Sequence, residues 1–269
     1  RSVALAPMDA DVRVVRDPKV YLVGRQQVDQ ASLDSFLDDH GVAWQTDTEV
    51  GGERLIEVSG RVCYMSFGSK RRRRTNKDYI GHILEVGHGS VLEHAAWNFI
   101  ITGVSRSFTH ELIRHRAGFG YSQLSQRYVD ESSADFVEPD CIAEDPNLHE
   151  LWLDAIRTSQ DAYRKLSAAL TEKYADIEDR TLRRKLARQA ARSVLPNATE
   201  TKIFVTTNAR AARHFVELRA NEHAETEIRK VAVQVLKLLQ KEAPNVFGDY
   251  QLKPLSDGTE AAYTTHVKV

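Results

Sequence analysis

SRSFTHELIRHRAGFGYSQLSQRY, residues 105–128, is the stretch that decides the fold. Its first half carries Arg106, His110 and Arg114 at intervals of four residues. This spacing predicts a helix over 105–116 with the three side chains on one face. The glycines within 117–120 predict a break, and after it the pattern alternates with a period of two, which predicts a polar strand. The two faces of that strand would carry Gln123, Ser125 and Arg127 on one side and Leu124, Gln126 and Tyr128 on the other.

A cationic helix face that leads through a glycine turn into a polar strand face suits a phosphate-bearing ligand. Arginine side chains match phosphate oxygens geometrically, and glutamine and serine can bind the edges of a sugar or a base. The alternative is a solvated helix followed by an edge strand, and charge runs are more often of that kind. That alternative explains poorly why the following strand is also polar on one side. We therefore infer a ligand site.

The same residues carry a family resemblance. Arg114-His115-Arg116, followed by Ser125-Gln126-Arg127-Tyr128, resembles the signature of the flavin-dependent thymidylate synthases, the ThyX family. The family signature is RHR, seven further residues and then serine, whereas eight residues separate Arg116 from Ser125 here. The resemblance covers essentially residues 53–250, and it includes the segment ARSVLPNATET at 191–201.

Composition limits the possible classes of protein. The chain has 269 residues, is 42% hydrophobic and has a formal net charge of −1. A chain of this length can bury a substantial core, and a neutral charge argues against a general nucleic-acid binder. No apolar run approaches the roughly 18 residues of a membrane span, and no signal-peptide pattern is visible. The two cysteines, Cys63 and Cys141, lack CxxC spacing, so we expect a reducing, cytoplasmic setting.

The fold class that we expect is α+β. The resemblance and the patterns together predict a single ThyX-like domain over 18–250, with a central, mostly antiparallel sheet flanked by long helices, an N-terminal tail over 1–17 and a C-terminal tail over 251–269. Residues 130–145 are expected to be a loop, and the chain from Pro244 onward is expected to be irregular. Helices are predicted over 31–40, 53–65, 76–85 with Asn76 as its cap, 148–174, 181–193 and 225–241, and strands over 20–23, 95–104 and 201–207.

The resemblance also implies roles for individual residues. Arg219 is the candidate for polarising the uracil ring, and it is expected to share a helical face with His223. Ser125 is expected to position the pyrimidine and not to act as a nucleophile. Nucleotide binding is implied for Arg106, Glu111, Gln123, Ser125, Gln126, Arg127, Tyr128, Arg192 and Arg219. Flavin binding is implied for Cys63, Ser90, His94, Arg114, His115, Arg116, Asn208, Arg210, His214 and His223.

The activity implied by the resemblance is conversion of dUMP to dTMP. It would use 5,10-methylenetetrahydrofolate as carbon donor, FAD as hydride carrier and NADPH as reductant, in a homotetramer. Neither cysteine has the basic, helix-terminal surroundings that would make it a nucleophile, which agrees with flavin chemistry.

Three alternatives remain. The first is a relative that methylates UMP, because the longer spacer could admit a 2′-hydroxyl. The second is an RNA-binding module, against which the neutral charge argues, and the third and weakest is a metal-dependent hydrolase. Lys70–Arg74 is more simply a solvated loop than a funnel for anions. His82, His88 and His94 are six residues apart, which places no pair of them on one helix face, so we expect no metal site there.

Overall fold

The structure is a computed structural model, and it describes residues 12–68, 73 and 75–269. The basic run Lys70–Arg74 lies outside the described residues except for Arg73. Contacts divide the chain into two compact units. Unit 1 comprises Arg1–Pro18, Thr102–Thr109 and Gln123–Lys202, and unit 2 comprises Lys19–Ile101, His110–Ser122 and Ile203–Val269. The single domain over 18–250 stays a prediction.

The central antiparallel sheet has the strand order β2-β3-β6-β4. The strands are β2 (Lys19–Arg25), β3 (Ala96–Ser105), β4 (Phe119–Gln123) and β6 (Glu200–Asn208), and the last three have residues in both units. Trp97, Phe99 and Ile101 alternate along β3 and are at most 2% exposed, so every second residue enters the core. The predicted mixture of helices with a central antiparallel sheet is confirmed.

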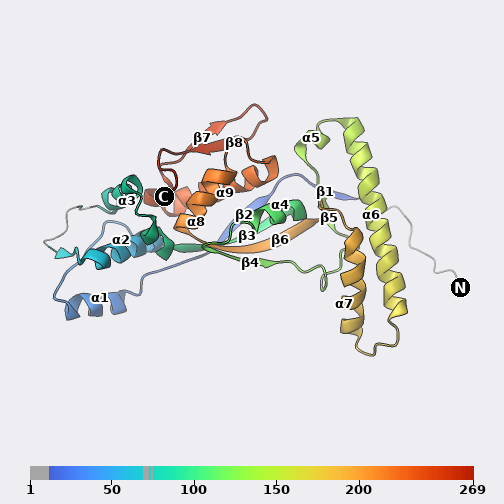
Figure 1. Ribbon diagram of the computed structural model, residues 1–269, viewed down its shortest axis with the longest axis horizontal. Helices are drawn as coiled ribbons and strands as arrows, with labels where there is room; N and C mark the ends of the chain where they lie inside the picture. Colours follow the sequence, from blue (N-terminus) through green and yellow to red (C-terminus); the bar gives the residue numbers. More distant parts are fainter. Residues whose placement is uncertain (1–11, 69–72, 74) are drawn as a thin grey trace. The chain divides into compact units, whose positions relative to one another are not determined.

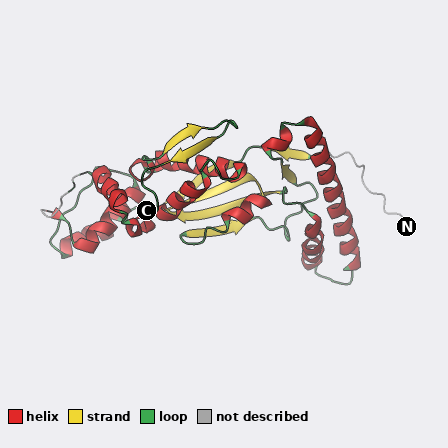
Figure 2. Cartoon of the chain, turned by 45° about the horizontal axis from the view of Figure 1, so that its top comes forward, coloured by secondary structure: helices red, strands yellow, loops and turns green. Residues whose placement is uncertain are grey.

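Helices of unit 2 lie next to this sheet, as the cartoon in Figure 2 shows. Ile228, Val231 and Leu239 are fully buried on one face of α9, as its helical period predicts. The helices are α1 (Gln30–Asp39), α2 (Gly51–Tyr64), α3 (Asn76–Val86), η2 (Gly89–His94), α8 (Ala209–Arg219), α9 (Thr226–Glu242) and α10 (Pro244–Phe247).

Two expectations about unit 2 are wrong. Thr75 caps α3 by accepting a hydrogen bond from the Asp78 amide at 3.1 Å, whereas Asn76 is fully buried and donates to Glu57 Oε2 at 2.9 Å. The chain after Pro244 is also regular: beyond α10, β7 (Gln251–Pro254) and β8 (Glu260–Tyr263) form an antiparallel hairpin, visible in Figure 1. Strands of this length are too short for their alternation to stand out in sequence.

Unit 1 contains a helical pair and a small parallel sheet. In Figure 1, α6 (Pro146–Lys173) lies beside α7 (Arg180–Ala191), which leads into the short helix η3 (Arg192–Val194). β1 (Arg13–Val15) pairs in parallel with β5 (Asp135–Val137), and the short α5 (Asp140–Ala143) follows. The expected tail over 1–17 and loop over 130–145 are therefore wrong in their described parts. Phe136 of β5 and Ile156 of α6 pack in one hydrophobic cluster. The polar residues around Phe136 in the sequence gave no sign that it would be buried.

The stretch at 105–128 is shorter in both of its elements than its periodicity predicts. α4 (Arg106–Leu112) ends before Arg114, so Arg114 is not on the helical face of Arg106. β4 begins at Phe119, inside the expected break, and ends at Gln123. Ser125 then forms a turn, because its carbonyl accepts hydrogen bonds from the amides of Tyr128 and Val129 at 3.1 and 3.0 Å. The predicted strand is therefore wrong beyond Gln123, since the chain forms this hydrogen-bonded turn and does not continue the strand ladder.

Each unit carries one cysteine. Cys63 lies in α2 of unit 2 and Cys141 in α5 of unit 1, and both thiols are free and exposed. No helix within the described part of the chain is long and apolar enough to cross a membrane.

Candidate functional site

Arg219, the last residue of α8, lies between two side chains of unit 2. Its Nη1 is 2.9 Å from Glu111 Oε2, and its Nε donates a hydrogen bond to His115 Nε2 at 3.0 Å. Arg114 binds the other oxygen of the Glu111 carboxylate at 3.3 Å. A guanidinium carries five N–H donors, so these two contacts leave Arg219 with donors for a ligand.

His115 accepts that hydrogen bond because its ring is uncharged. The side chain is 8% exposed, and its pKa is lowered to about 4, mainly by burial. The charges of Arg219, His214 and Arg114 lower this pKa further, whereas the charge of Glu111 raises it. A neutral ring that accepts at Nε2 carries its proton on Nδ1. The Tyr121 hydroxyl lies 2.6 Å from the carbonyl oxygen of His115, which holds the backbone of this segment.

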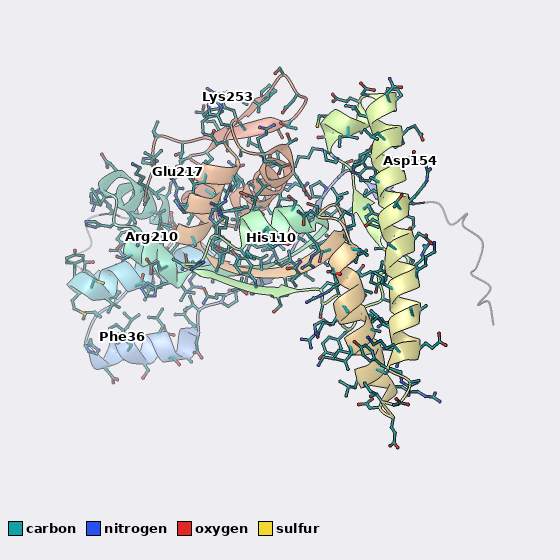
Figure 3. All side chains as sticks on the ribbon, turned by 45° about the vertical axis from the view of Figure 1, so that its right-hand side comes forward. Phe36, His110, Asp154, Arg210, Glu217 and Lys253 are labelled. Atoms are coloured by element: carbon teal, nitrogen blue, oxygen red, sulfur yellow. The ribbon has the colours of Figure 1, made fainter. Side chains whose placement is uncertain are left out.

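Asn208, Arg210 and His214 line a cavity of about 350 Å³ in unit 2. Asn208 caps α8, since its side chain accepts a hydrogen bond from the Ala211 amide at 2.9 Å, and the first turn of α8 borders the cavity. Figure 3 shows Arg210 at the start of this helix, where Nη1 is 2.6 Å from Glu93 Oε1. Aligned backbone dipoles and cations at this end of α8 favour an anionic group.

Gly118 provides close backbone approach at the same cavity. Its φ is +73°, and a Cβ at this position would lie 2.7 Å from Asn208 Nδ2 and 2.7 Å from Ala211 Cβ. The residue is thus restricted to glycine both by its backbone conformation and by its neighbours. A glycine turn beside a helix N-terminus and two basic side chains fits the phosphate-bearing part of a dinucleotide cofactor.

In unit 1, Arg106 and Arg192 form a cationic pair. Burial lowers the pKa of Arg106, the charge of Arg192 lowers it further, and Glu131 opposes both. No carboxylate in the described part of the chain forms a salt bridge with either arginine. Two neighbouring arginines without a bonded carboxylate are suited to a phosphate dianion.

Buried polar atoms without a partner lie in the same unit. Gln126 Nε2, Arg127 Nε and Glu131 Oε1 are buried and form no hydrogen bond with the described residues. Glu131 is 5% exposed, and burial raises its pKa to about 7, although the charge of Arg106 opposes this shift. Because unpartnered buried donors cost free energy, their presence fits a polar ligand that satisfies them.

The remaining predicted nucleotide residues are Gln123, at the end of β4, and those of the Ser125 turn. The Ser125 hydroxyl accepts a weak hydrogen bond from the Arg127 amide at 3.4 Å. The Tyr128 carbonyl accepts from Arg188 at 2.6 Å, and the Tyr128 ring lies 5.2 Å from Lys185 Nζ. Gln123 donates to Thr109 Oγ1 at 3.3 Å. The turn therefore carries polar groups but no base that would activate the Ser125 hydroxyl within these contacts.

The structure does not bring every predicted flavin residue into these clusters. The side chains of Cys63, Ser90, His94, Arg116 and His223 are exposed, and no recorded side-chain contact joins them to Arg219 or to the cavity beside Asn208. α8 ends at Arg219, so the expectation that His223 shares its helical face is wrong. Their roles stay predictions. No group of three or more metal-ligating side chains occurs in residues 12–68, 73 and 75–269.

Other residues at these clusters were missed by sequence reasoning. Glu93, Lys268 and Val269 line the cavity beside Asn208, and Glu131 neighbours the arginine pair. A second cavity of about 590 Å³ in unit 2 is lined partly by Arg61, Tyr79 and His88. Glu131 follows the signature by three residues, so its position was available as a signal. Lys268 and Val269 gave none, because no periodic pattern in 264–269 connects these residues with a distant helix.

Comparisons with known proteins identify the family of this chain. The model of the family described as thymidylate synthase complementing protein matches residues 46–245. A flavin-dependent thymidylate synthase of Mycolicibacterium gilvum (strain PYR-GCK) is 54% identical over 222 residues, which cover 82% of this chain and 88% of that protein. The enzyme of the same name from Mycobacterium avium (strain 104) is 52% identical over 228 residues, covering 84% of this chain and 90% of that protein.

A solved structure shares the fold at a greater evolutionary distance. The crystal structure of the UMP/dUMP methylase PolB from Streptomyces cacaoi bound with 5-Br UMP matches with a TM-score of 0.61 and 19% identity, over 88% of this chain and 95% of that chain. By the family match and the identity to the curated relatives, this chain belongs to the thymidylate synthase complementing protein family, the ThyX family.

Proposed function

We propose that this chain catalyses the flavin-dependent C5 methylation of dUMP to dTMP. The observation that carries the proposal is the identity of more than half of the aligned residues to relatives named flavin-dependent thymidylate synthase, over most of both chains. 5,10-Methylenetetrahydrofolate donates the carbon and NADPH is the reductant. When bound, FAD supplies the hydride that turns the transferred methylene carbon into a methyl group, while the C5 proton of the pyrimidine is lost.

Arg219 polarises the pyrimidine in this proposal. Glu111 and the uncharged His115 fix the guanidinium through two of its nitrogens, so its remaining donors are aimed before a ligand binds. A donor fixed in advance stabilises negative charge on the pyrimidine without reorganising during the reaction. His115 adds no positive charge to that of the guanidinium.

The nucleotide phosphate is bound by Arg106 and Arg192. The absence of bonded carboxylates in the described residues around this pair and the unpartnered donors of Gln126 and Arg127 support this role. Ser125 positions the nucleotide and is not a nucleophile, because its recorded contacts include no general base.

The flavin is bound beside Asn208, Arg210 and His214. The donor set fits the cofactor: basic side chains, a helix N-terminus and the Gly118 turn border one cavity. A homotetramer in the cytoplasm completes the proposal. Leu148 and Leu151 on α6 are 45% and 69% exposed, and apolar side chains of this kind fit a subunit contact.

UMP is the second candidate acceptor. It is favoured by the spacer, in which eight residues stand where the family signature has seven. The extra residue lies close to the segment proposed to bind the nucleotide, where it could make room for a 2′-hydroxyl.

Turnover of dUMP and of UMP, each with FAD, NADPH and methylenetetrahydrofolate, tests both candidates. We expect turnover with dUMP and at most a small fraction of that rate with UMP. Comparable rates would move the proposal to a methylase with a wider ribose pocket. Turnover of neither, in a preparation that binds FAD, would contradict the proposed activity.

A further inference from the structure

Residues 264–269, which we name the C-terminal strap, pass along α8 after β8 ends at Tyr263. Both the backbone and the side chains of the strap form hydrogen bonds with the rest of unit 2. The carbonyl oxygen of His266 accepts from Arg213 Nη2 at 3.2 Å, and the Lys268 amide donates to Glu217 Oε2 at 3.0 Å. Figure 3 shows Glu217 on α8, the helix that also carries Arg210. Successive turns of one helix therefore hold the strap.

A buried ion pair anchors the start of the strap. Arg213 is 2% exposed and binds Asp249 with two hydrogen bonds, at 2.7 and 2.8 Å. Asp249 Oδ2 also accepts from the Thr264 hydroxyl, and His266 Nδ1 lies 3.2 Å from the same oxygen. Because a buried ion pair with well-formed hydrogen bonds resists displacement, the strap starts from a fixed point.

The end of the strap reaches the cavity beside Asn208. Lys268 and Val269 line it together with Arg210 and His214, and Val269 is 8% exposed. Gly89 packs against both: a Cβ on Gly89 would lie 2.6 Å from the Val269 carbonyl carbon and 2.9 Å from Arg210 Nε. Only glycine allows so close an approach.

The backbone of Lys268 is in an unfavourable conformation at this point. Its φ is +59°, in the left-handed region that residues other than glycine seldom adopt. Such a conformation persists where the surrounding contacts determine it, and ligand-binding segments are a common place for it. Here those contacts are the hydrogen bond that the Lys268 amide donates to Glu217 Oε2 and the burial of Val269.

We propose that the C-terminal strap is a wall of the flavin site, in which Lys268 supplies a positive charge to the phosphate groups of FAD. This inference rests on the proposed function. Lys268 adds a cation to the cavity where the charge of Arg210 is already shared with Glu93. The pyrophosphate of FAD is the anionic part of the cofactor, and a cation beside the first turn of α8 complements it.

Substitution of Lys268 tests the charge separately from the fold. Lys268→Asn removes the charge and keeps a residue that tolerates a left-handed backbone. Lys253→Asn, on β7 of the same unit and away from the cavity, is the matched control. The dissociation constants of FAD and of riboflavin, which has no phosphate, are measured by flavin fluorescence. We expect Lys268→Asn to weaken FAD about fivefold or more, to leave riboflavin unchanged, and the control to match the wild type for both.

The outcomes separate this inference from the function on which it rests. A wild-type protein that binds FAD, with an affinity that Lys268→Asn leaves unchanged or strengthens, would overturn the inference alone. Equal weakening of FAD and riboflavin would overturn the phosphate role. A wild-type protein that binds no flavin would overturn the proposed function and the inference with it.

Removal of the last residues tests the wall itself. A chain without residues 267–269 keeps the contacts of Thr264 and His266 with Asp249, so we expect it to remain folded, with a thermal midpoint lowered by the loss of the buried Val269 and of the Lys268 hydrogen bond to Glu217. Its affinity for FAD should fall about tenfold or more. In the intact chain, FAD should slow hydrogen exchange of the Lys268 amide. FAD affinity equal to the wild type, or exchange that FAD leaves unaltered, would contradict the proposed wall.

Discussion

Arg219 depends on the geometry of its two partners as much as on its charge. Glu111 and His115 bind different nitrogens of one planar group, which sets the direction of the remaining donors. A lysine has the same charge but a single nitrogen on a flexible stem, so it cannot contact both partners in the same geometry.

We therefore expect Arg219→Lys to lower kcat/KM for dUMP by about a hundredfold or more while the fold is retained. Steady-state kinetics and a thermal melt measure the two effects. Arg157→Lys is the control, because Arg157 is exposed on α6 and pairs with the exposed Asp154 at 3.0 Å. Turnover within about threefold of the wild type would remove Arg219 from the proposed mechanism.

Glu131 makes a pH-dependent contribution to stability. Burial raises its pKa from 4.5 to about 7, so the folded chain holds this proton at pH values where the unfolded chain has lost it. The resulting stabilisation is complete below the unfolded pKa and is lost as the pH rises through about 7. His115 has the opposite sign: its pKa is lowered from 6.5 to about 4, so its contribution is lost as the pH falls.

Comparison of the wild type with Glu131→Gln isolates the Glu131 contribution, because all other groups are common to both. Between about pH 5 and about pH 8, the free energy of unfolding of the wild type should fall by about 3 kcal/mol relative to the variant. Urea unfolding at both pH values measures this difference. Parallel pH profiles would mean that Glu131 titrates alike in the folded and unfolded chains.

At the level of elements, the turn before β4 is where an extra residue can be tolerated. β4 pairs with β6 in a fixed register, with the Asn208 amide bonded to the Gly118 carbonyl at 3.1 Å. One additional residue within a strand would reverse the face of every later side chain. The left-handed Gly118 lies just before the strand, so we place the extra residue of the spacer in this turn.

Gly118→Ala should destabilise the protein by about 1–3 kcal/mol, because the new Cβ meets Asn208 and Ala211 and the backbone disfavours it. FAD affinity should fall with it, since Asn208 would move. Gly120→Ala is the matched control: its Cβ would lie 3.7 Å from Thr206, an ordinary contact, and stability should change by no more than about 0.5 kcal/mol. Equal effects of the two substitutions on unfolding by urea would argue against a special role for Gly118.

Sequence predicted the long elements and missed the short ones for a physical reason. α6, α9 and β6 have apolar residues recurring over many positions, and they lie where their periods predict. β1, β5, β7 and β8 are three or four residues long, and each depends on a partner that is distant in sequence or on a turn. Periodicity contains no information about such partners.

The candidate site follows the same rule. The resemblance implied site roles for Glu111, His115 and Arg219, and the structure brings these three side chains together. The sequence pattern could not show that α4 ends at Leu112, because the end of a helix depends on local contacts of one or two residues and not on a repeated pattern. It also missed Lys268, whose place at the cavity arises from the anchoring of the strap by Arg213.

For the whole molecule, the path of the chain bears on how it unfolds. Three strands, β3, β4 and β6, have residues in both compact units, so neither unit is a continuous piece of sequence. Unfolding of one unit would break strands that the other also contains. We therefore expect one cooperative transition, in agreement with the predicted single domain.

The tryptophans report on the units separately. Trp44 and Trp97 lie in unit 2 and Trp152 lies in unit 1. In Trp152→Phe and in the double variant Trp44→Phe with Trp97→Phe, the urea midpoint from fluorescence should equal the midpoint from far-ultraviolet circular dichroism of the same variant. Midpoints that separate in either variant would show that the units unfold independently.

The free thiols of Cys63 and Cys141 allow the distance between the two units to be followed by energy transfer between attached dyes. They are the two cysteines of the chain, both exposed, and one belongs to each unit. A maleimide donor and acceptor could therefore be attached without introducing or removing a single cysteine. Energy transfer between the dyes, measured on single molecules, would record whether the separation of the units changes when a nucleotide is added.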